Sequence, residues 1–382
     1  MTITKKTNLI FMTILIYICL LNPFICFATN IEEDNVQDNE EVIEENTFKV
    51  FSEAAILMEQ STGKILYEKN AYKRMYPAST TKILTCIIAL EECDLDETAI
   101  ASEEAVNSVK NGYTKANIVP GEEFTIKQLL LLMQLQSANE AANIIAEHIS
   151  GSTEKFAELM NKKAKELGCK DSHFVNANGM HDENHYSTAY DLAQICRYCM
   201  KNKTYREIML TEKCDIPDTE IWNNYKIENG REDEPYREFY NTNKLLQKGN
   251  QYYYPYCTGG KTGFTTPAKN CFIATSNKDG FELVSVILHA ELTDDEKSAR
   301  YVDTINLFNY GYDNYNLEDI KKEYPDTVEE VSSSAVEEKV DDLPKAIYQT
   351  LKPDNTKAIV MMSVGFVVLM IGFILLRRCK KK

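Results

Sequence analysis

The sequence predicts an α+β fold in which both ends of the folded unit contribute strands to one antiparallel sheet. Short apolar runs occur early, at 54–58 and 65–67, and return late, at 271–276 and 283–289. The long segment between them is predicted to be mainly helical. Strands near both ends of a domain with helices between them are typical of the α+β class. We therefore expect one sheet packed against a helical lobe.

Each pair of apolar runs is predicted to form a hairpin. Ser61-Thr62-Gly63-Lys64 separates the early runs, and Asn277-Lys278-Asp279-Gly280 separates the late ones. Gly, Asn, Asp and Ser favour tight turns because they tolerate left-handed backbone or bond to their own backbone. The two hairpins supply the strands at either end of the unit.

Helices are predicted from apolar segments with boundary signals. Their ranges are 83–90, 126–136, 138–149, 153–167 and 189–200. Gly168 is the expected end of the fourth helix, since glycine commonly follows a helix C-terminus. Pro77-Ala78-Ser79 precedes the first helix, and proline at a helix start is an ordinary signal. Ser79 is therefore expected at a helix N-terminus.

The two ends of the chain predict export and membrane anchoring. Lys5 and Lys6 precede an apolar run over 9–21 and the small residue Ala28, which is the pattern of a signal peptide over 1–28. Residues 358–376 form a predominantly apolar stretch of nineteen residues without a charge, which spans about 28 Å as a helix. Basic residues at 377–382 follow and favour the cytoplasm. We expect a single-pass cell-membrane protein whose folded domain is extracytoplasmic.

Composition defines the parts between these ends. Residues 31–46 hold eight acidic side chains and no basic one, so 29–47 is predicted to be a disordered lead. A second acidic segment, 316–357, is predicted to be a stalk. The folded domain is then 48–315. The net charge of −16 argues against a nucleic-acid partner, because phosphate binding requires clustered Lys and Arg.

Cysteine usage indicates neither a metal site nor a cofactor. Of eleven cysteines, two lie in the signal segment and Cys379 lies in the basic tail. Cys196 and Cys199 stand three residues apart on a predicted helix, which raises zinc binding as an alternative. No second pair of Cys or His follows at zinc spacing, so structural thiols are favoured. Whether the eight remaining cysteines form disulfides stays open.

Three short motifs carry the candidate chemistry. They are Ser79-Thr80-Thr81-Lys82, Ser137-Ala138-Asn139 and Lys261-Thr262-Gly263, in this order. Taken singly, each has an ordinary explanation: a helix cap, a loop between helices and a turn. Their joint occurrence in an exported chain favours a catalytic site.

The residue types fit a serine nucleophile with a lysine base. Ser79 and Lys82, three residues apart on a helix, share one face at its positive end. Lys82 can remove the hydroxyl proton if burial and the nearby charge of Lys261 lower its pKa. Ser137 is expected to relay a proton towards a leaving amine. Asn139 is expected to orient Lys82 and a substrate amide.

The third motif is expected to bind the substrate. Lys261 and Thr262 offer a charge and a hydroxyl to a substrate carboxylate. Gly263 lets a substrate backbone approach closely, because glycine has no side chain. Together the motifs predict acyl transfer through an ester on Ser79.

In these motifs the chain resembles the low-molecular-mass penicillin-binding proteins, the D-alanyl-D-alanine carboxypeptidases of serine peptidase family S11. The resemblance covers about 48–315 and implies a β-lactamase/transpeptidase-like fold. Further matching stretches are 76–82, 176–180, 185–189, 241–246, 260–265 and 309–312. Two positions depart from the family pattern, Lys269 and His289, where glycine is common. These differences concern substrate fit and not the reaction type.

The resemblance implies hydrolysis of the terminal D-alanine of peptidoglycan stem peptides, in cell-wall biogenesis, with β-lactam antibiotics as covalent inhibitors. It places the oxyanion hole at the backbone N–H groups of Ser79 and Phe264, and it assigns Arg300 to the terminal carboxylate. Two alternatives stay open. One is a catalytically idle penicillin sensor or wall-binding module. The other is a β-lactamase, which the absence of a suitably placed Glu disfavours.

Overall fold

The computed structural model describes residues 49–233 and 237–324. The predicted signal peptide, the acidic lead, the span at 358–376 and the basic tail lie outside the described residues, as does most of the predicted stalk. The chain divides into two units, Met1–Thr47 and Phe48–Lys382, and the described residues belong to the second. Within the described ranges, no helix has both the length and the apolar character that crossing a membrane requires.

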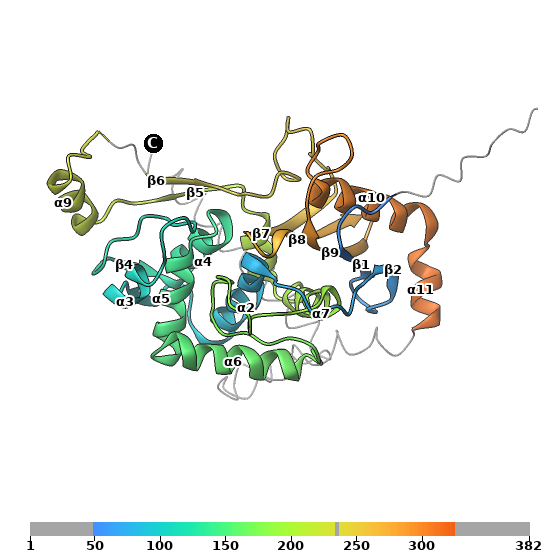
Figure 1. The fold of residues 1–382 in the computed structure, drawn as a ribbon, viewed down its shortest axis with the longest axis horizontal. Helices are drawn as coiled ribbons and strands as arrows, with labels where there is room; N and C mark the ends of the chain where they lie inside the picture. Colours follow the sequence, from blue (N-terminus) through green and yellow to red (C-terminus); the bar gives the residue numbers. More distant parts are fainter. Residues whose placement is uncertain (1–48, 234–236, 325–382) are drawn as a thin grey trace, which may run out of the picture. The chain divides into compact units, whose positions relative to one another are not determined.

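A five-stranded antiparallel sheet lies at the centre of the second unit (Figure 1). Its strand order is β2-β1-β9-β8-β7. The bounds are β1 Ala54–Glu59, β2 Ile65–Lys69, β7 Cys257–Thr265, β8 Lys269–Lys278 and β9 Phe281–Ala290. Strand β1 pairs with β2 on one side and with β9 on the other, where Leu57 lies opposite Ser285. The prediction that early and late hairpins share one sheet is confirmed.

Both faces of the sheet are buried, each in its own apolar core. Along β1, Ile56 and Met58 belong to one core, whereas Ala55 and Leu57 belong to the other. This alternation follows from the two-residue repeat of a strand. The first core lies against the helical lobe, as predicted. The second is covered by α10 Ala299–Asn314, so helices lie on both faces and not on one alone.

Five helices of the lobe match the predicted ranges to within about two residues, and two further helices, α3 and α8, were not predicted. The helices of the lobe are α2 Lys82–Glu92, α3 Glu103–Asn107, α4 Ile126–Leu135, α5 Asn139–Ser150, α6 Thr153–Glu166, α7 Ala189–Cys199 and α8 Lys203–Leu210. Side chains of Thr125, Ser152 and Thr188 cap α4, α6 and α7. Gly168 follows the end of α6 with a φ of +79°, the left-handed conformation expected there.

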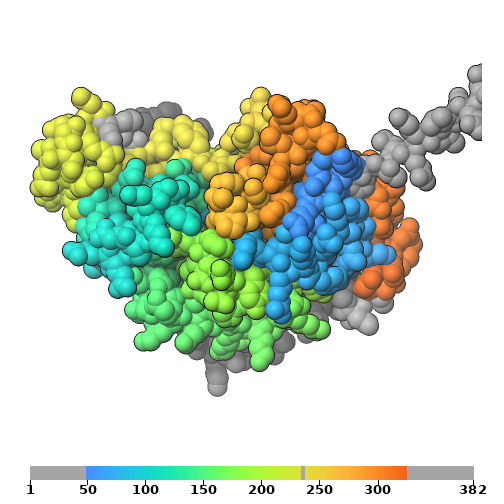
Figure 2. All heavy atoms as spheres, viewed as in Figure 1, coloured from blue at the N-terminus to red at the C-terminus, as the bar shows by residue number. Residues whose placement is uncertain are grey.

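An insertion that the sequence did not predict extends from the lobe. It consists of α9 Glu220–Glu228 between β5 Lys213–Ile216 and β6 Arg237–Tyr240, which pair as a two-stranded sheet. The Arg237 guanidinium is buried, 2.8 Å from the Glu122 carboxylate, and stacks over Trp222. Glu122 precedes the short strand β4 Glu123–Thr125, which pairs with β3 Thr98–Ile100. Figure 2 shows the insertion (yellow-green) against this part of the lobe (teal).

The folded unit continues past Tyr315, where the predicted domain ends. Helix α11, Leu317–Glu323, packs Ile320 into the core of α10, with 2% of that side chain exposed. Glu323 forms an ion pair with Lys64 in the turn after β1. The predicted stalk over 316–357 therefore begins too early, because this acidic segment contains apolar residues, Ile320 and Leu317, that pack a short helix onto the core.

The eight cysteines of the described residues are free thiols. Cys196 and Cys199 are fully buried in α7, where the Cys199 thiol lies 3.6 Å from the carbonyl oxygen of Ile83 in α2. Burial raises the pKa of the Cys196 thiol to about 12. Both residues pack as apolar side chains between two helices, in agreement with structural thiols.

Candidate active site

The nucleophile turn is a short 3-10 helix, η1 Ala78–Thr81, that runs directly into α2. In a 3-10 turn, side chains three residues apart eclipse each other, which brings Ser79 over Lys82. The Ser79 Oγ and Lys82 Nζ atoms are 3.0 Å apart. Ala78 has a φ of +49°, a left-handed conformation that costs a non-glycine residue roughly 1–2 kcal/mol. The surrounding structure therefore has to hold this turn in place.

Lys82 is buried and has three polar partners. Besides Ser79, its Nζ donates to Asn139 Oδ1 at 2.8 Å and to the carbonyl oxygen of Asn178. Burial first, and the charge of Lys261 second, hold the pKa of Lys82 well below its ordinary value. A neutral amine has two N–H groups and one lone pair. Since two partners are oxygens that can only accept, the lone pair is left for the Ser79 hydroxyl.

Lys261 lies in the middle of β7 with no exposed surface. Its Nζ donates to the carbonyl oxygen of Thr262 at 3.1 Å. Burial, and secondly the charge of Arg300, lower the pKa of Lys261 to about 7. The next residue, Thr262, has its hydroxyl 2.7 Å from that of Thr242. The site thus holds two buried lysines whose pKa values both lie below the ordinary value.

Gly263 has a packing role that was not predicted. A Cβ atom at this position would lie 2.9 Å from the backbone nitrogen of Ser79 and 3.1 Å from that of Thr80. Contacts this short force one backbone to move. Glycine therefore lets β7 lie against the nucleophile turn, and the predicted contact with a substrate backbone stays a prediction.

The candidate residues converge on one cavity of about 240 Å³. Its lining residues are Ser79, Gly112, Tyr113, Thr114, Gln136, Ser137, Asn139, Gly179, Met180, Thr242, Thr262, Gly263, Phe264, Thr265 and Arg300. Arg300 is the one charged side chain among them, so the cavity suits an anionic group. Ser79 and Phe264, the residues of the predicted oxyanion hole, both line it. All nine residues predicted from the motifs and the resemblance lie in this cavity or directly behind it.

The second motif is held by the loop in front of it. Ser137 lies between α4 and α5 with a φ of +61°, and Asn139 begins α5. The amide nitrogen of the Asn139 side chain donates to the carbonyl oxygen of Thr114 at 2.9 Å. The buried Glu140 carboxylate accepts from the backbone N–H of Ala116 at 2.6 Å. These bonds fix the loop that contributes Gly112, Tyr113 and Thr114 to the cavity.

Two residues that hold the nucleophile turn and Lys82 in place, His185 and Asn178, were not predicted from the sequence. Asn178 supplies a backbone carbonyl to Lys82, and its side chain donates to Asn143 at 2.8 Å. His185 lies 2.8 Å from the Thr81 hydroxyl and accepts from the backbone N–H of Val175. Burial lowers the pKa of His185 to about 3, so the neutral ring donates to Thr81. Both residues lie in stretches that resemble the family, 176–180 and 185–189, and this resemblance was the sequence signal that could have identified them.

Lys269 and His289 lie outside the cavity lining and have backbone φ angles of +55° and +53°. Glycine favours this left-handed region, which explains why it is common at these positions. The Lys269 amine lies 3.3 Å from Glu291, and the His289 ring lies 3.5 Å from Glu53. Both residues therefore adopt a strained backbone outside the cavity, and the expected effect on substrate fit stays a prediction.

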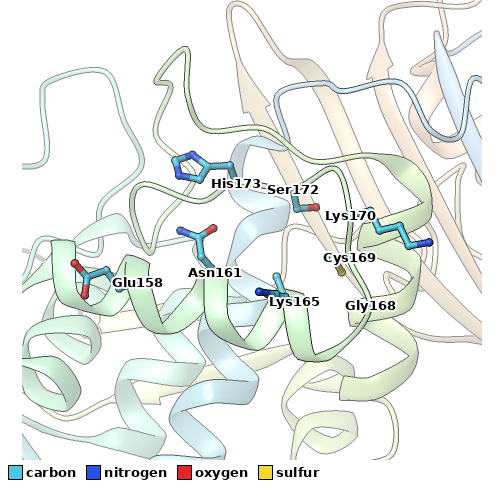
Figure 3. A pocket seen from close by; sticks show the side chains of 9 residues that line it. Glu158, Asn161, Lys165, Gly168, Cys169, Lys170, Ser172 and His173 are labelled. Atoms are coloured by element: carbon cyan, nitrogen blue, oxygen red, sulfur yellow. The ribbon is translucent and has the colours of Figure 1, made fainter.

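A larger cavity of about 750 Å³ lies between α6 and the segment that follows it (Figure 3). Its potential nucleophile is Cys169, but burial raises the pKa of this thiol to about 12. The Ser172 hydroxyl donates to Asp191, and the His173 ring bonds to the carbonyl oxygen of Asn184. These side chains are occupied in structural bonds, so the smaller cavity at Ser79 is the candidate active site.

Comparisons with known proteins agree with this geometry. The family described as peptidase S11, D-alanyl-D-alanine carboxypeptidase, matches residues 40–292. The chain is 33% identical over 270 residues to D-alanyl-D-alanine carboxypeptidase DacF of Bacillus subtilis (strain 168), which covers 70% of this chain and 64% of that protein. The chain thus matches a little under two thirds of the length of that relative.

The fold is similar to solved structures of a D-alanyl-D-alanine carboxypeptidase and a DD-transpeptidase. The crystal structure of a D-alanyl-D-alanine carboxypeptidase from Mycobacterium tuberculosis H37Rv is 26% identical, with a TM-score of 0.61, over 70% of this chain and 94% of that one. The Streptomyces K15 DD-transpeptidase is 28% identical, with a TM-score of 0.60, over 69% and 98%. The chain has the β-lactamase/transpeptidase-like fold, and it belongs to the peptidase S11 family of D-alanyl-D-alanine carboxypeptidases.

Proposed function

We propose that this protein is a serine-type D-Ala-D-Ala carboxypeptidase that removes the terminal D-alanine of peptidoglycan stem peptides. The contact between Ser79 Oγ and Lys82 Nζ carries the proposal. The amine is buried, its pKa lies well below the ordinary value, and its two N–H groups have carbonyl acceptors. This arrangement leaves a base aimed at one hydroxyl, which is what activation of a serine requires.

The reaction follows from these positions. Lys82 takes the hydroxyl proton while Ser79 Oγ attacks the carbonyl carbon of the penultimate D-alanine. The N–H groups of Ser79 and Phe264 stabilise the oxyanion. Collapse breaks the peptide bond, and the proton passes from Lys82 by way of Ser137 to the leaving amine of D-alanine. Water then cleaves the ester, with Lys82 again as the base, and restores the Ser79 hydroxyl.

Substrate recognition is assigned to the cationic end of the cavity. The terminal carboxylate of the peptide would contact Arg300 and the Thr262 hydroxyl, with Lys261 beneath them. Asn139 would donate to a substrate amide, since its Oδ1 atom is occupied by Lys82. A β-lactam with its own carboxylate would enter the same way and leave a stable ester on Ser79.

The lining of the cavity favours this function over a β-lactamase. Within the described residues, neither Asp nor Glu lines it. A rapid β-lactamase needs a base for the deacylating water, and in class A enzymes Glu has that role. The idle sensor is not favoured either, since the complete pair of Ser79 and Lys82 is in contact.

The test is incubation of the protein with diacetyl-Lys-D-Ala-D-Ala, with free D-alanine as the readout. The carboxypeptidase releases D-alanine in repeated turnovers. A penicillin sensor would take up fluorescent penicillin yet release none, and a β-lactamase would hydrolyse penicillin faster than the peptide. Either of these results would contradict the proposal.

Gly263→Ala is expected to slow penicillin labelling strongly while leaving the fold intact. The added methyl group would push β7 away from the backbone of Ser79 and Thr80 and widen the oxyanion hole, and loss of one oxyanion donor costs roughly 10²–10³-fold. The second-order rate of labelling measures this effect. Gly280→Ala is a control for lost stability alone, because a Cβ there meets nothing within 4 Å but the φ of +88° strains an alanine, and the residue lies outside the cavity. Wild-type labelling by Gly263→Ala would contradict the close-packing role.

Arg300→Gln is expected to shift the alkaline limb of the pH profile upwards. The active state has neutral Lys82 and charged Lys261, so kcat/KM falls as the pH rises through the Lys261 pKa of about 7. Arg300 lowers this pKa, and removing its charge raises it. Arg300→Lys, which keeps a charge, should leave the limb nearer its original pH. The measurement is penicillin acylation rate against pH, and an unmoved limb in Arg300→Gln would contradict the assignment.

We also propose that the domain is held outside the cell membrane by the span at 358–376, after removal of residues 1–28. The supporting observations are the apolar lengths and the basic residues at 377–382. Intact cells are treated with a protease that can reach the outer face of the cell membrane. The protease should digest an epitope in the folded domain and spare one at the C-terminus. Survival of the domain epitope would contradict this topology.

A further inference from the structure

A second cluster of reactive side chains lies apart from the active-site cavity. It consists of Cys93, Glu97 and His148, whose ligand atoms all lie within 4.8 Å of one another. The His148 Nε2 and Glu97 Oε1 atoms are 2.8 Å apart. Among the described residues, no other three His, Cys, Asp or Glu side chains have their ligand atoms this close together. None of the three lines the cavity at Ser79.

The three residues stand on fixed backbone. Cys93 is the C-terminal cap of α2, with its N–H bonded to the carbonyl oxygen of Ala89. The N–H of Glu97 donates to Asp94 at 3.1 Å, and its carbonyl oxygen accepts from Ile126 at 2.8 Å. His148 lies in the last turn of α5. Formation of the cluster therefore requires little ordering of backbone on binding.

The cluster is also open and negatively charged. The exposed fractions of the His148 and Glu97 side chains are 23% and 45%, so an ion can enter from solvent. Residues 91–97 include five acidic residues and no basic one. Such a segment attracts cations to the thiol and the imidazole beside it.

Thiolate, imidazole and carboxylate together are ligands of Zn²⁺. With metal–ligand bonds of about 2.0–2.3 Å, tetrahedral geometry places ligand atoms roughly 3.3–3.8 Å apart. The observed separations, 2.8 Å for one pair and up to 4.8 Å overall, bracket this range. Rotation of exposed side chains is enough to reach it.

We propose that Cys93 Sγ, Glu97 Oε1 and His148 Nε2 bind one Zn²⁺ ion, with water as the fourth ligand. On binding, the Cys93 thiol releases its proton to solvent. Glu97 and His148 exchange their mutual contact for bonds to the metal. The neutral His148 ring keeps its proton on Nδ1.

The site would join two helices that carry active-site residues at their other ends. Helix α2 begins with Lys82 and α5 begins with Asn139, and these helices of 11 and 12 residues are about 16–18 Å long. At that distance the ion does not contact the substrate. It would hold the two helices together, and because it binds the folded state it would raise the unfolding temperature.

The test is Zn²⁺ binding by the metal-free full-length chain, measured by competition with a chromophoric chelator. We expect one ion per chain and a higher unfolding temperature with Zn²⁺. Co²⁺ should give a thiolate-to-cobalt charge-transfer band in the near ultraviolet. Cys93→Ser and His148→Gln should each weaken Zn²⁺ binding by more than about 100-fold and remove or shift the band.

Cys214→Ser is the matched control, because Cys214 is also half-buried but belongs to no such cluster of the described residues. It should keep wild-type affinity and the band. Unchanged affinity in Cys93→Ser, or wild-type protein without the cobalt band, would overturn the proposal. Far-ultraviolet circular dichroism without metal checks the fold of each variant. If Cys93→Ser fails to fold, Glu97→Gln replaces it, because the Glu97 side chain is exposed. Weakened Zn²⁺ binding by Glu97→Gln would then support the proposal, and unchanged affinity would overturn it.

Discussion

Ser79→Ala is expected to abolish both covalent labelling by fluorescent penicillin and release of D-alanine from diacetyl-Lys-D-Ala-D-Ala. The Ser79 hydroxyl is the nucleophile that Lys82 contacts, at 3.0 Å, and the substitution leaves no oxygen there to form the ester. The alanine side chain fits the turn, so the unfolding temperature should stay close to that of the wild-type protein. Labelling on a gel and an assay for D-alanine measure the two losses.

Ser61→Ala is a suitable control, since Ser61 is an exposed serine in the turn between β1 and β2. It should label and hydrolyse as the wild-type protein does. If the wild-type chain takes up penicillin at a residue other than Ser79, the proposed mechanism is wrong even though the fold stands. If Ser79 labels but D-alanine never appears, the protein is a sensor.

Lys82→Ala is expected to reduce both reactions by roughly 10²–10⁴-fold, the usual contribution of general-base catalysis. The base is lost, and the Ser79 hydroxyl keeps its proton. The substitution also leaves Asn139 Oδ1 and the carbonyl oxygen of Asn178 without their donor, which costs stability by about 1–3 kcal/mol for a buried group. Stopped-flow acylation rates and a denaturation curve separate the two effects.

Lys82→Arg distinguishes a base from a mere positive charge. Arginine keeps the charge but cannot give up its proton at neutral pH, so acylation should fall about as far as in Lys82→Ala. Lys82→Met, which fills the same space without an amine, should lose as much. Acylation within tenfold of the wild-type rate in a well-folded Lys82 variant would show that another group removes the proton.

Much of the fold was predictable because its signals are local. The hairpins β1-β2 and β8-β9 are set by turn residues next to short apolar runs, and α6 is set by its cap and by Gly168. The reactive pair Ser79 and Lys82 is local as well, three residues apart on one turn. The joining of both hairpins in one sheet was also predicted, since two apolar hairpins at opposite ends of a domain bury their strands in this way. The pairing of β1 with β9 came from the structure.

Other features depended on contacts that no short pattern records. The insertion around α9 is held by Arg237 against Glu122, which are 115 residues apart. Helix α11 is held through three of its residues inside an acidic segment, namely the buried Ile320, Leu317, and Glu323, which forms an ion pair with Lys64. The proposed zinc ligands come from the ends of two helices and a turn, so their spacing along the chain resembles no zinc motif.

By itself, the sequence determined the identity and order of the reactive groups, because side chains with the required chemistry stand in three recognisable motifs. The tertiary structure decided which groups surround them. Lys82 donates a hydrogen bond to the backbone carbonyl oxygen of Asn178. Position 263 has to be glycine because the backbone nitrogen of Ser79 lies too close for a side chain. Every residue has a backbone carbonyl and every residue except proline has an N–H group, so these partners leave no mark on the sequence. Their selection depends on how distant segments pack around two buried lysines.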